Sequence, residues 1–588
     1  IDSGAQCPDA ENHVPRAVQE AQDAVDRLIA SLADDTQLSE MERFVRESIE
    51  PEADEREPTR SAPVHLIISS KRALTEKYGV FGFEQLDSDL RVLQRAVQVR
   101  TGLESMILYV DDEESVTRLG FQPVDANNPW QVKKLVDNLD TQLADEGREI
   151  RYVLIVGGDG IVPFHRLPNP VDDQDSDVPS DNPYASRDAN YLIPERAIGR
   201  MPDGGNEGLD FLHTLIRTAV RAHRSRAESK GLLSNLSAVL NALGNRPGNG
   251  HGVGYTASIW RKASRAVFRV IGDDDRLRTC PPLTYQDFQI TEPPHLSYFN
   301  LHGIEDGPNW YGQRDALFPA DYPLFPLALR PQDPSINEHA NAVVFTEACY
   351  GANILRKNQN DSIALRLMAV GALAVVGSTK VSYGSIAPPL LGADLMGKYF
   401  WEGLWAHLTV GEALRHAKVT MASDMQERQG YLDDEDQKAL ISFVLYGDPS
   451  LPITSIQKGA GMTVSRDVLC PPIICPRRTE IQKGIASDEL VASVKSRIET
   501  CLPHMSHARM RARPLTFCSG VCREGCSKPR AGIESTLQPS QKGLNEQGRG
   551  WAFTLQKDIA IRGDGAHHQV VRVVVDESGH ILRMAVSK

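Results

Sequence analysis

The chain is predicted to be an α/β protein with parallel sheets, and three observations support this. Short apolar runs of β character recur between residues 62 and 455. Segments with apolar residues at helical spacing separate these runs. The runs are apolar throughout instead of alternating with polar residues, which is typical of strands buried on both faces of a parallel sheet. We therefore expect two tandem α/β units, over residues 62–205 and 206–455.

Individual elements follow from the same patterns. In the first unit we expect strands at His65–Ile68, Met106–Val110 and Tyr152–Val156. Between the last two, apolar side chains at Val132, Leu135, Val136 and Leu139 have helical spacing. The strands expected in the second unit are Ser237–Leu240, Leu296–Asn300, Ala342–Phe345 and Ala372–Val376.

Two segments of different composition flank these units. Residues 1–61 are predicted to form an acidic helical leader and linker, either a small appendage, which we favour, or a removable inhibitory segment. Residues 456–588 are rich in Cys, Pro, Arg and Ser and show weak periodicity. They are predicted to end in a β-hairpin, with strands at Val570–Val575 and Ile581–Val586 around a turn at residues 576–579.

Composition and charge exclude several classes of function. The 588 residues carry a formal net charge of −14, which argues against nucleic-acid phosphates or an anionic membrane as the main partner. No stretch approaches the roughly 18–20 apolar residues of a membrane span. The nine cysteines do not indicate a compartment, and the chain carries no export signal. We favour a cytoplasmic location over secretion, and the oligomeric state stays open.

Two chemically reactive side chains follow predicted strands of the second unit. The run ending at Leu301 leads into His302 and Gly303, and the run ending at Phe345 leads into Cys349, 47 residues after His302. Ligands of open parallel sheets bind beyond the carboxyl ends of the strands, where both motifs lie. A thiol is a strong nucleophile once deprotonated, and an imidazole can take its proton and pass it to the leaving amine. This pairing predicts nucleophilic catalysis by Cys349 with His302 as acid and base.

The same two motifs supply donors for an oxyanion. The backbone N–H groups of Gly303 and Cys349 are the natural candidates, since glycine allows close approach of the backbone. Taken alone, a Cys after a strand is more often a small buried apolar residue, and a His-Gly pair is more often a turn. The combination at two strand ends favours the catalytic interpretation.

The sequence resembles the gingipain family of the caspase-like clan of cysteine peptidases. The resemblance spans about residues 62–455 and includes the catalytic-type motifs Asn300–Gly303 and Glu347–Cys349. The other segments that carry it are Tyr152–Asp159 with Val162–Phe164, Ser180–Tyr184 with Tyr191, Glu195–Arg200 with Pro202, Gly371–Thr379 with Tyr383, and Tyr446–Leu451.

The resemblance implies a caspase-like (caspase/hemoglobinase) parallel-sheet sandwich and an endopeptidase that selects the residue before the scissile bond. It implies Glu195 as a third catalytic member that orients His302. The alternatives for Glu195 are a solvated loop carboxylate or a structural salt bridge with Arg196 or Arg200. It also implies that Ser378, Thr379 and Tyr383 belong to one wall of the primary substrate pocket. Latency as a zymogen fits the same family.

No cofactor is expected to be required, and calcium is a candidate structural ion. The acidic series Asp172, Asp173, Asp175, Asp177 and Asp181 fails as an EF-hand, and a solvated acidic loop is favoured over a calcium site. Cys518, Cys522 and Cys526, with His504 and His507 upstream, match no standard zinc or iron–sulfur spacing well.

Three functions remain in competition. The first is a cysteine endopeptidase acting on protein or peptide substrates, held latent by its leader or tail. The second is a signalling protease of the same clan that cuts a single partner protein. The third is an inactive α/β scaffold or nucleotide-binding protein that uses the glycine-rich loop Gly248–Gly254, which lacks the Lys-Ser/Thr ending of a P-loop.

Overall fold

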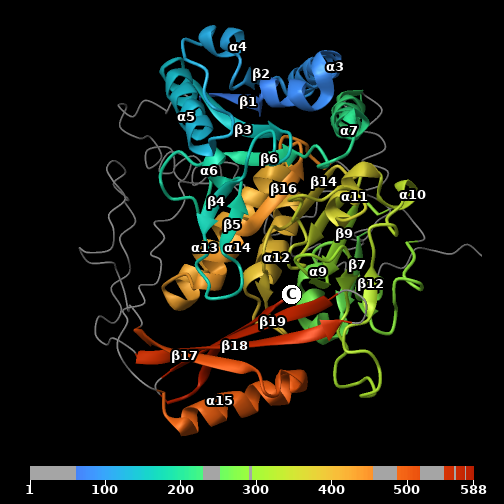
Figure 1. Cartoon of the computed structure of the whole chain (residues 1–588), viewed down its shortest axis with the longest axis vertical. Coiled ribbons are helices and arrows are strands. Elements are labelled where there is room, and N and C mark those ends of the chain that lie inside the picture. Colours follow the sequence, from blue (N-terminus) through green and yellow to red (C-terminus); the bar gives the residue numbers. More distant parts are fainter. Residues whose placement is uncertain are drawn as a thin grey trace, which may run out of the picture. The chain divides into compact units, whose positions relative to one another are not determined.

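The computed structural model describes residues 61–228, 252–290, 294–453, 486–516, 549–561, 565–576 and 578–588. The predicted leader, the predicted strand Ser237–Leu240, most of the loop Gly248–Gly254 and the cysteines from Cys518 to Cys526 lie outside these residues. The central feature of the described part is one ten-stranded sheet (Figure 1). Its strands, in spatial order, are β2 (Glu104–Tyr109), β1 (Ala62–Ser69), β3 (Arg148–Val156), β6 (Ala197–Met201), β16 (Phe443–Gly447), β14 (Ala374–Ser378), β13 (Val343–Thr346), β9 (Leu296–Asn300), β7 (Val253–Ala257) and β8 (Leu277–Cys280).

The sheet has two halves, and β16 from the predicted unit 206–455 lies in the same half as the strands of residues 62–205. Within each half the neighbouring strands pair in parallel, from β2 to β16 and from β14 to β8. The halves meet where β16 pairs antiparallel with β14, so that Ser378 lies opposite Phe443. The prediction of an α/β fold with a mostly parallel sheet is confirmed, and it agrees with the caspase-like architecture that the resemblance implies.

The helices begin at residues suited to capping. Ser70 caps α3, and Asn128 caps α5, which has Pro129 in its first turn. Thr409 and Glu412 form a capping box at the start of α13. The helices of the α/β part are α3 (Lys71–Thr101), α4 (Glu113–Thr117), α5 (Pro129–Asp145), α6 (Asn182–Ala185), α7 (Leu209–Glu228), α9 (Arg261–Phe268), α10 (Ile336–His339), α11 (Ile363–Ala369), α12 (Gly392–Trp405), α13 (Val410–Gln429) and α14 (Asp434–Ser442).

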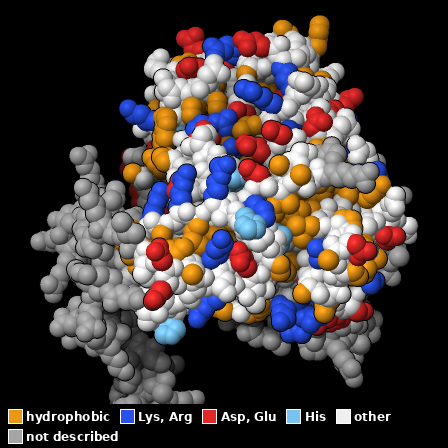
Figure 2. All heavy atoms as spheres, turned by 60° about the horizontal axis from the view of Figure 1, so that its bottom comes forward, with side chains coloured by type: hydrophobic (Ala, Val, Ile, Leu, Met, Phe, Trp, Pro, Cys, Tyr) orange, Lys and Arg blue, Asp and Glu red, His pale blue; other side chains and the backbone are white. Residues whose placement is uncertain are grey.

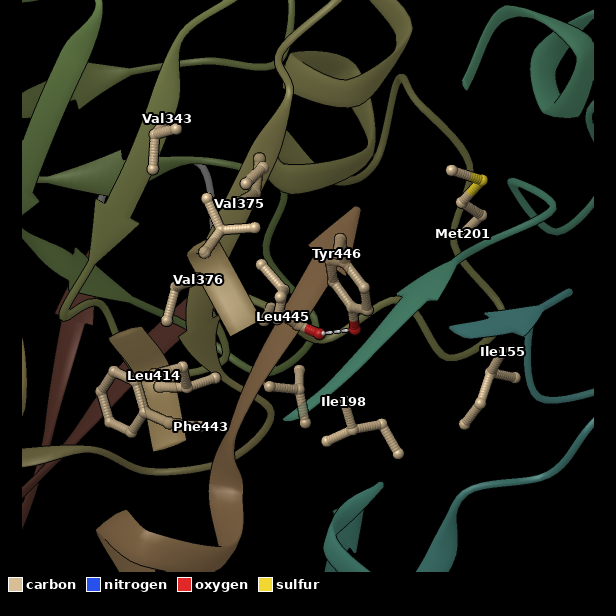
Figure 3. Close-up of a cluster of buried hydrophobic side chains, with 14 of the residues drawn as sticks. Ile155, Ile198, Met201, Val343, Val375, Val376, Leu414, Phe443, Leu445 and Tyr446 are labelled. Carbon is tan, nitrogen blue, oxygen red and sulfur yellow. Dashed lines mark hydrogen bonds between the residues drawn. The ribbon is translucent and has the colours of Figure 1, made fainter. Parts of the chain in front are cut away.

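The hydrophobic core continues across the junction between the two halves. Figure 3 shows side chains of the first half, such as Ile155 and Ile198, near those of β16 and β14. At this junction the Tyr446 hydroxyl donates to the carbonyl oxygen of Ala352 over 2.5 Å. The closing motif of the resemblance, Tyr446–Leu451, therefore occupies the centre of the sheet, where it joins the two halves.

A second, antiparallel sheet lies beside the first. Its strands, in order, are β15 (Tyr383–Gly384), β20 (Ile581–Ser587), β19 (Gly565–Asp576), β18 (Arg549–Ile561) and β17 (Arg509–Thr516). Together with helix α15 (Asp488–Cys501), strands β17 to β20 form what we call the β-module, the described residues between 486 and 588. The hairpin predicted near the end of the sequence is present as β19 and β20. The fifth strand, β15, belongs to the α/β part.

The remaining strands are short connections of the α/β part. They are β4 (His165–Pro168) paired with β5 (Asp177–Ser180), and β10 (His302–Gly303), β11 (Trp310–Tyr311) and β12 (Leu327–Leu329), which form a three-stranded sheet. Among the described helices, none is long and apolar enough to cross a membrane.

A buried ion pair supports the first half of the sheet. The Arg200 side chain is fully buried, and its Nε and Nη2 atoms contact the Asp181 carboxylate at 3.0 and 2.5 Å. Its Nη1 atom also donates to the carbonyl oxygens of Gly157 and Val162. The guanidinium lies 4.1 Å from the ring centre of Phe164. Asp181 and Arg200 belong to two segments of the resemblance, so those segments have a structural reason to occur together.

We expect Asp181→Asn to lower the free energy of unfolding by about 3–5 kcal/mol, because it leaves the buried Arg200 charge without its anionic partner. Urea denaturation followed by tryptophan fluorescence measures this change. Asp274→Asn is the matched control, because Asp274 pairs with Arg269 at the surface, and it should leave the transition unchanged. Equal effects of the two substitutions would contradict the structural role of the buried pair.

Candidate active site

The structure brings Cys349 and the His302–Gly303 motif together. Strands β9 and β13 are adjacent and parallel, so the loops after their carboxyl ends lie at the same edge of the sheet. The contact is close: a Cβ atom added to Gly303 would lie 1.9 Å from the Cys349 carbonyl oxygen. Glycine is therefore required at position 303, because any side chain would push the two loops apart.

The Cys349 thiol is buried, with 2% of the residue exposed. Its sulfur contacts the backbone of Ser382, accepting from the amide at 3.2 Å and lying 3.5 Å from the carbonyl oxygen. Burial raises the pKa of this thiol to about 12, and hydrogen bonds from the backbone of Ser382 and Lys588 act in the opposite direction. The Cys349 thiol is therefore protonated at neutral pH.

The His302 ring is also buried and carries no charge. Its Nε2 atom is 2.7 Å from Oε1 of Gln313, and its Nδ1 atom has no hydrogen-bonding partner among the described residues. Aromatic rings surround it, with the ring centres of Trp260 at 4.3 Å and His567 at 4.5 Å. Burial, together with the nearby His567, holds the pKa of His302 well below its ordinary value. One ring nitrogen thus remains available for proton exchange.

The backbone around Cys349 suits the proposed oxyanion role. Tyr350 has a positive φ of 56°, which marks a tight turn directly after the nucleophile. The amides of Tyr350 and Gly351 donate to Lys380 and Ala348. The Cys349 amide has no hydrogen bond to another described residue, so it can donate to a bound group, whereas Gly303 pairs with Trp310 in the short sheet of β10 and β11.

Glu195 lies away from the dyad. Its carboxylate accepts from the Arg187 amide at 2.8 Å, and burial raises its pKa. It precedes β6, which is four strand positions from β9, a separation of about 19 Å at the usual strand spacing. The structure therefore does not place Glu195 as the partner of His302, and Gln313 occupies the corresponding position. The alternative salt bridge is also not formed, since Arg196 pairs with Asp140 and Arg200 with Asp181.

The three residues predicted for the pocket wall are buried, and their hydroxyl groups bond other parts of the chain. The Ser378 hydroxyl bonds Ser442, and the Thr379 hydroxyl donates to the carbonyl oxygen of Pro179. The Tyr383 hydroxyl donates to Asp173 at 2.6 Å, and its side chain belongs to a buried apolar cluster that includes Cys349. The Tyr383 backbone is part of β15, which pairs with β20.

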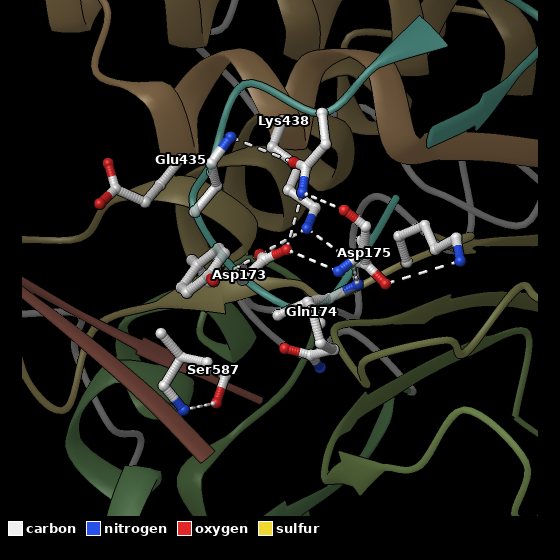
Figure 4. Close-up of polar contacts among 12 residues, drawn as sticks. Asp173, Gln174, Asp175, Glu435, Lys438 and Ser587 are labelled. Atoms are coloured by element: carbon white, nitrogen blue, oxygen red, sulfur yellow. Dashed lines mark hydrogen bonds and ion pairs between the residues drawn. The ribbon is translucent and has the colours of Figure 1, made fainter. Parts of the chain in front are cut away.

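The predicted acidic loop is a buried ionic network instead of a solvated loop. Lys438 on α14 lies 2.6 Å from both Asp173 and Asp175, and all three side chains are inaccessible to solvent (Figure 4). Asp175 also accepts from the Tyr350 hydroxyl and the Val381 amide. Buried carboxylates are stable only when they are paired, and Lys438 supplies the partner here. Through Asp175 the network also binds Tyr350, directly after Cys349, and Val381, directly before Ser382.

Four of the five carboxylates of this acidic series, all except Asp177, have an ion pair with a lysine or arginine among the described residues. Asp181 binds Arg200, and Asp172 lies 2.7 Å from Arg513 of the β-module. In the described part of the chain, no three His, Cys, Asp or Glu side chains gather closely enough to hold a metal ion. A calcium ion at this series would have to displace the lysine and arginine partners.

Besides Asp173 and Asp175, a second pair of buried acids lies near Cys349, and sequence reasoning did not predict it. Glu347 and Asp394 are buried and lie 3.3 and 3.0 Å from the Lys588 Nζ atom. Glu347 also accepts from the Tyr298 hydroxyl at 2.5 Å, and Asp394 accepts from the Ser385 amide. Glu347 was visible as part of the cysteine motif, but Asp394 comes from α12, and no local pattern connects it with Cys349.

A small cleft lies beside Cys349. Its lining includes the loops after β9 and β13, through Gly303 and Cys349, together with Trp310, Tyr350 and Gly351.

Comparisons with known proteins point to peptidases. The model of Peptidase family C25 matches residues 329–454, a segment that contains Cys349 and Asp394 but neither His302 nor Glu195. No curated protein matches the chain. A structure described as "Structure of Protease" is 10% identical with a TM-score of 0.42, over 91% of this chain and 98% of that chain. The separase–securin complex of Saccharomyces cerevisiae has a TM-score of 0.27 at 10% identity, over 54% of this chain and 17% of that chain.

TM-scores below 0.5 do not establish a shared fold, so the family match carries the comparison. Among the strands of the large sheet, that match includes β13, β14 and β16. It supports a peptidase of the caspase-like clan.

Proposed function

We propose that this chain is a cysteine endopeptidase of the gingipain type that cleaves protein or peptide substrates at Cys349. The observation that carries the proposal is the meeting of Cys349 and His302–Gly303 at adjacent strand ends, in contact through the Gly303 backbone. Beside Cys349, strand β15 pairs with an extended segment of the chain, which is how a groove of this kind would hold a peptide. The family match over residues 329–454 supports the same assignment.

The reaction would follow from these groups. His302 takes the proton of the Cys349 thiol, and the sulfur attacks the carbonyl carbon of the bound peptide. The Cys349 amide stabilises the oxyanion, and collapse of the intermediate breaks the C–N bond as His302 protonates the leaving amine. Water then splits the thioester and regenerates the thiol. Gln313 would orient the imidazole through the nitrogen that it already contacts.

Cys349→Ala should abolish cleavage of a peptide library, because it removes the nucleophile while deleting only a sulfur atom from the core. Mass spectrometry of the products gives the cut sites. Cys280→Ala is the matched control, because Cys280 is an equally buried thiol at the end of strand β8 of the same sheet. Cleavage that survives in Cys349→Ala, or is lost equally in Cys280→Ala, would refute the assignment.

His302→Ala should lower kcat by about 10²–10⁴-fold through loss of acid–base catalysis. Glu195→Gln should leave kcat within a few-fold of the parent, since Glu195 contacts Arg187 and not the dyad. Steady-state kinetics on one cleaved peptide compare the two. A loss in Glu195→Gln that matches the loss in His302→Ala would show that Glu195 reaches the imidazole in the working enzyme.

The raised thiol pKa gives a pH dependence. The pKa of Cys349 is about 12, so the thiolate fraction rises about tenfold for each pH unit below that value. Alkylation of Cys349 by iodoacetamide should therefore accelerate from pH 7 to pH 10 without reaching a plateau. Peptide mass spectrometry measures the rate, and the exposed Cys501 serves as the internal control for reagent quality. A plateau below pH 8 would mean that the thiolate is already stabilised by His302.

A further inference from the structure

The groove beside Cys349 is occupied by the chain itself. Strand β20 of the β-module pairs antiparallel with β15, with Val586 opposite Gly384 and Ser587 opposite Tyr383. The pairing continues where the Lys588 amide donates to the carbonyl oxygen of Ser382 over 2.9 Å. Ser382 is the residue whose amide contacts the Cys349 sulfur. The extended segment therefore reaches the nucleophile in the manner of a peptide added to the edge of a sheet.

The Lys588 side chain fills a closed, acidic pocket. It is inaccessible to solvent, and its Nζ atom contacts Asp394 at 3.0 Å, Glu347 at 3.3 Å and the carbonyl oxygen of Ser385 at 3.4 Å. The ammonium lies 4.4 Å from the ring centre of Trp260. Asp394 and the Ser385 carbonyl oxygen accept hydrogen bonds from the ammonium, and the Glu347 carboxylate lies within ion-pair distance of it. The pocket thus matches a lysine side chain in length and charge.

Two features show that the pocket requires a long cation. A Cβ atom at Gly384 would lie 2.2 Å from the Lys588 Cε atom, so only glycine leaves room for the stem. Burial and the neighbouring Asp394 raise the pKa of Glu347 well above its usual value, whereas the Lys588 charge lowers it. Two buried acids side by side are unfavourable without a cation between them.

The β-module also covers the catalytic histidine. His567 on β19 packs edge-on against the His302 ring, and Phe325 packs against both rings. Nε2 of His504 lies 3.3 Å from Nε2 of Gln313, the residue that contacts His302. Cys349 and His302 are therefore both closed off from solvent in part by the module.

Ion pairs clamp the module onto α14. The buried Arg583 side chain binds the Asp436 carboxylate with both terminal nitrogens, at 2.6 and 2.7 Å. Arg572 contacts Asp434 and Glu435 on the same helix. Figure 2 shows the molecule from the side on which the β-module lies in Figure 1, with blue and red side chains spread among hydrophobic ones. The contacts with α14 pair the two arginines Arg572 and Arg583 with acids of the α/β part.

We propose that the β-module is a built-in inhibitor that occupies the substrate groove, with Lys588 seated in the primary specificity pocket formed by Asp394, Glu347, Trp260 and Gly384. The proposal rests on the proposed peptidase function and names the groups that would select the substrate. A substrate would bind in the same way, with a lysine before the scissile bond, after the module has left the groove.

The test compares the intact chain with Lys588→Ala and Lys588→Arg. The substrate is the peptide Ala-Val-Ser-Lys with an aminocoumarin leaving group, which repeats the residues that occupy the groove, and a norleucine analogue tests the charge. The alkylation rate of Cys349 is measured in parallel as a readout that needs no catalysis. Because loss of the buried lysine could also disturb folding, Arg583→Met provides a second variant that weakens the clamp away from the pocket.

Lys588→Ala should hydrolyse the lysyl peptide at least about tenfold faster than the intact chain, because a buried charge pair that holds the module is lost. Alkylation of Cys349 should accelerate with it, Arg583→Met should change both rates in the same direction, and Lys588→Arg should stay near the parent. Equal hydrolysis and equal alkylation in all four proteins would overturn the inhibitor role. Faster alkylation without hydrolysis of any peptide would support the occupied groove and refute the peptidase function.

The pocket is tested separately in the Lys588→Ala background. Asp394→Asn should reduce the preference for the lysyl over the norleucyl peptide by at least about tenfold, mainly through KM, since the ammonium loses a charged acceptor. Cys349 alkylation should be unchanged by this substitution. An unaltered preference would remove Asp394 from the specificity pocket.

Discussion

The parallel pairing of β9 with β13 is the constraint on which the active site depends. It brings two loops that are distant in sequence to one edge of the sheet, and the strand spacing of about 4.8 Å leaves little room between them. Gly303 meets this condition because it has no side chain to collide with the Cys349 carbonyl. The ionic network of Lys438, Asp173 and Asp175 then fixes the segments on either side of the nucleophile. The geometry of the proposed site is thus produced by the backbone and by buried charges together.

Much of this fold could be predicted from local pattern. The runs at Tyr152–Val156 and Leu296–Asn300 are continuous and rich in β-formers, and both are strands. Strand β6 was harder, because Ala197–Met201 contains Gly199 and Arg200 and looked only like part of a motif. Its arginine can be buried because it pairs with Asp181, which lies in a separate segment of the chain. Strand direction at β16 was also beyond local pattern, since it depends on pairing with β14.

The candidate site divides in the same way. Cys349, His302 and Gly303 could be predicted as a site because reactive side chains directly after strands have few structural explanations when they occur together. The role predicted for Glu195 came from the resemblance alone, and in the structure Gln313 contacts His302 while Glu195 contacts Arg187. Asp394 could not have been found from the sequence. It is an acid in the first turn of α12, and only the tertiary fold brings its carboxylate close to Glu347. Buried charges have meaning only in relation to partners, and those partners are distant in sequence.

The groove at β15 and the strand β20 that occupies it belong to one chain, and this affects the kinetics of opening. A covalently attached partner has an effective concentration on the order of millimolar, whatever the concentration of the protein. Dilution therefore does not free the groove, and the rate of opening is a first-order property of each molecule. A diffusing peptide competes with β20 only during the moments when the strand is away from β15. In the proposed inhibited enzyme, the opening of an internal sheet edge would set the timing of activity, and substrate abundance would determine only how often such an opening is used.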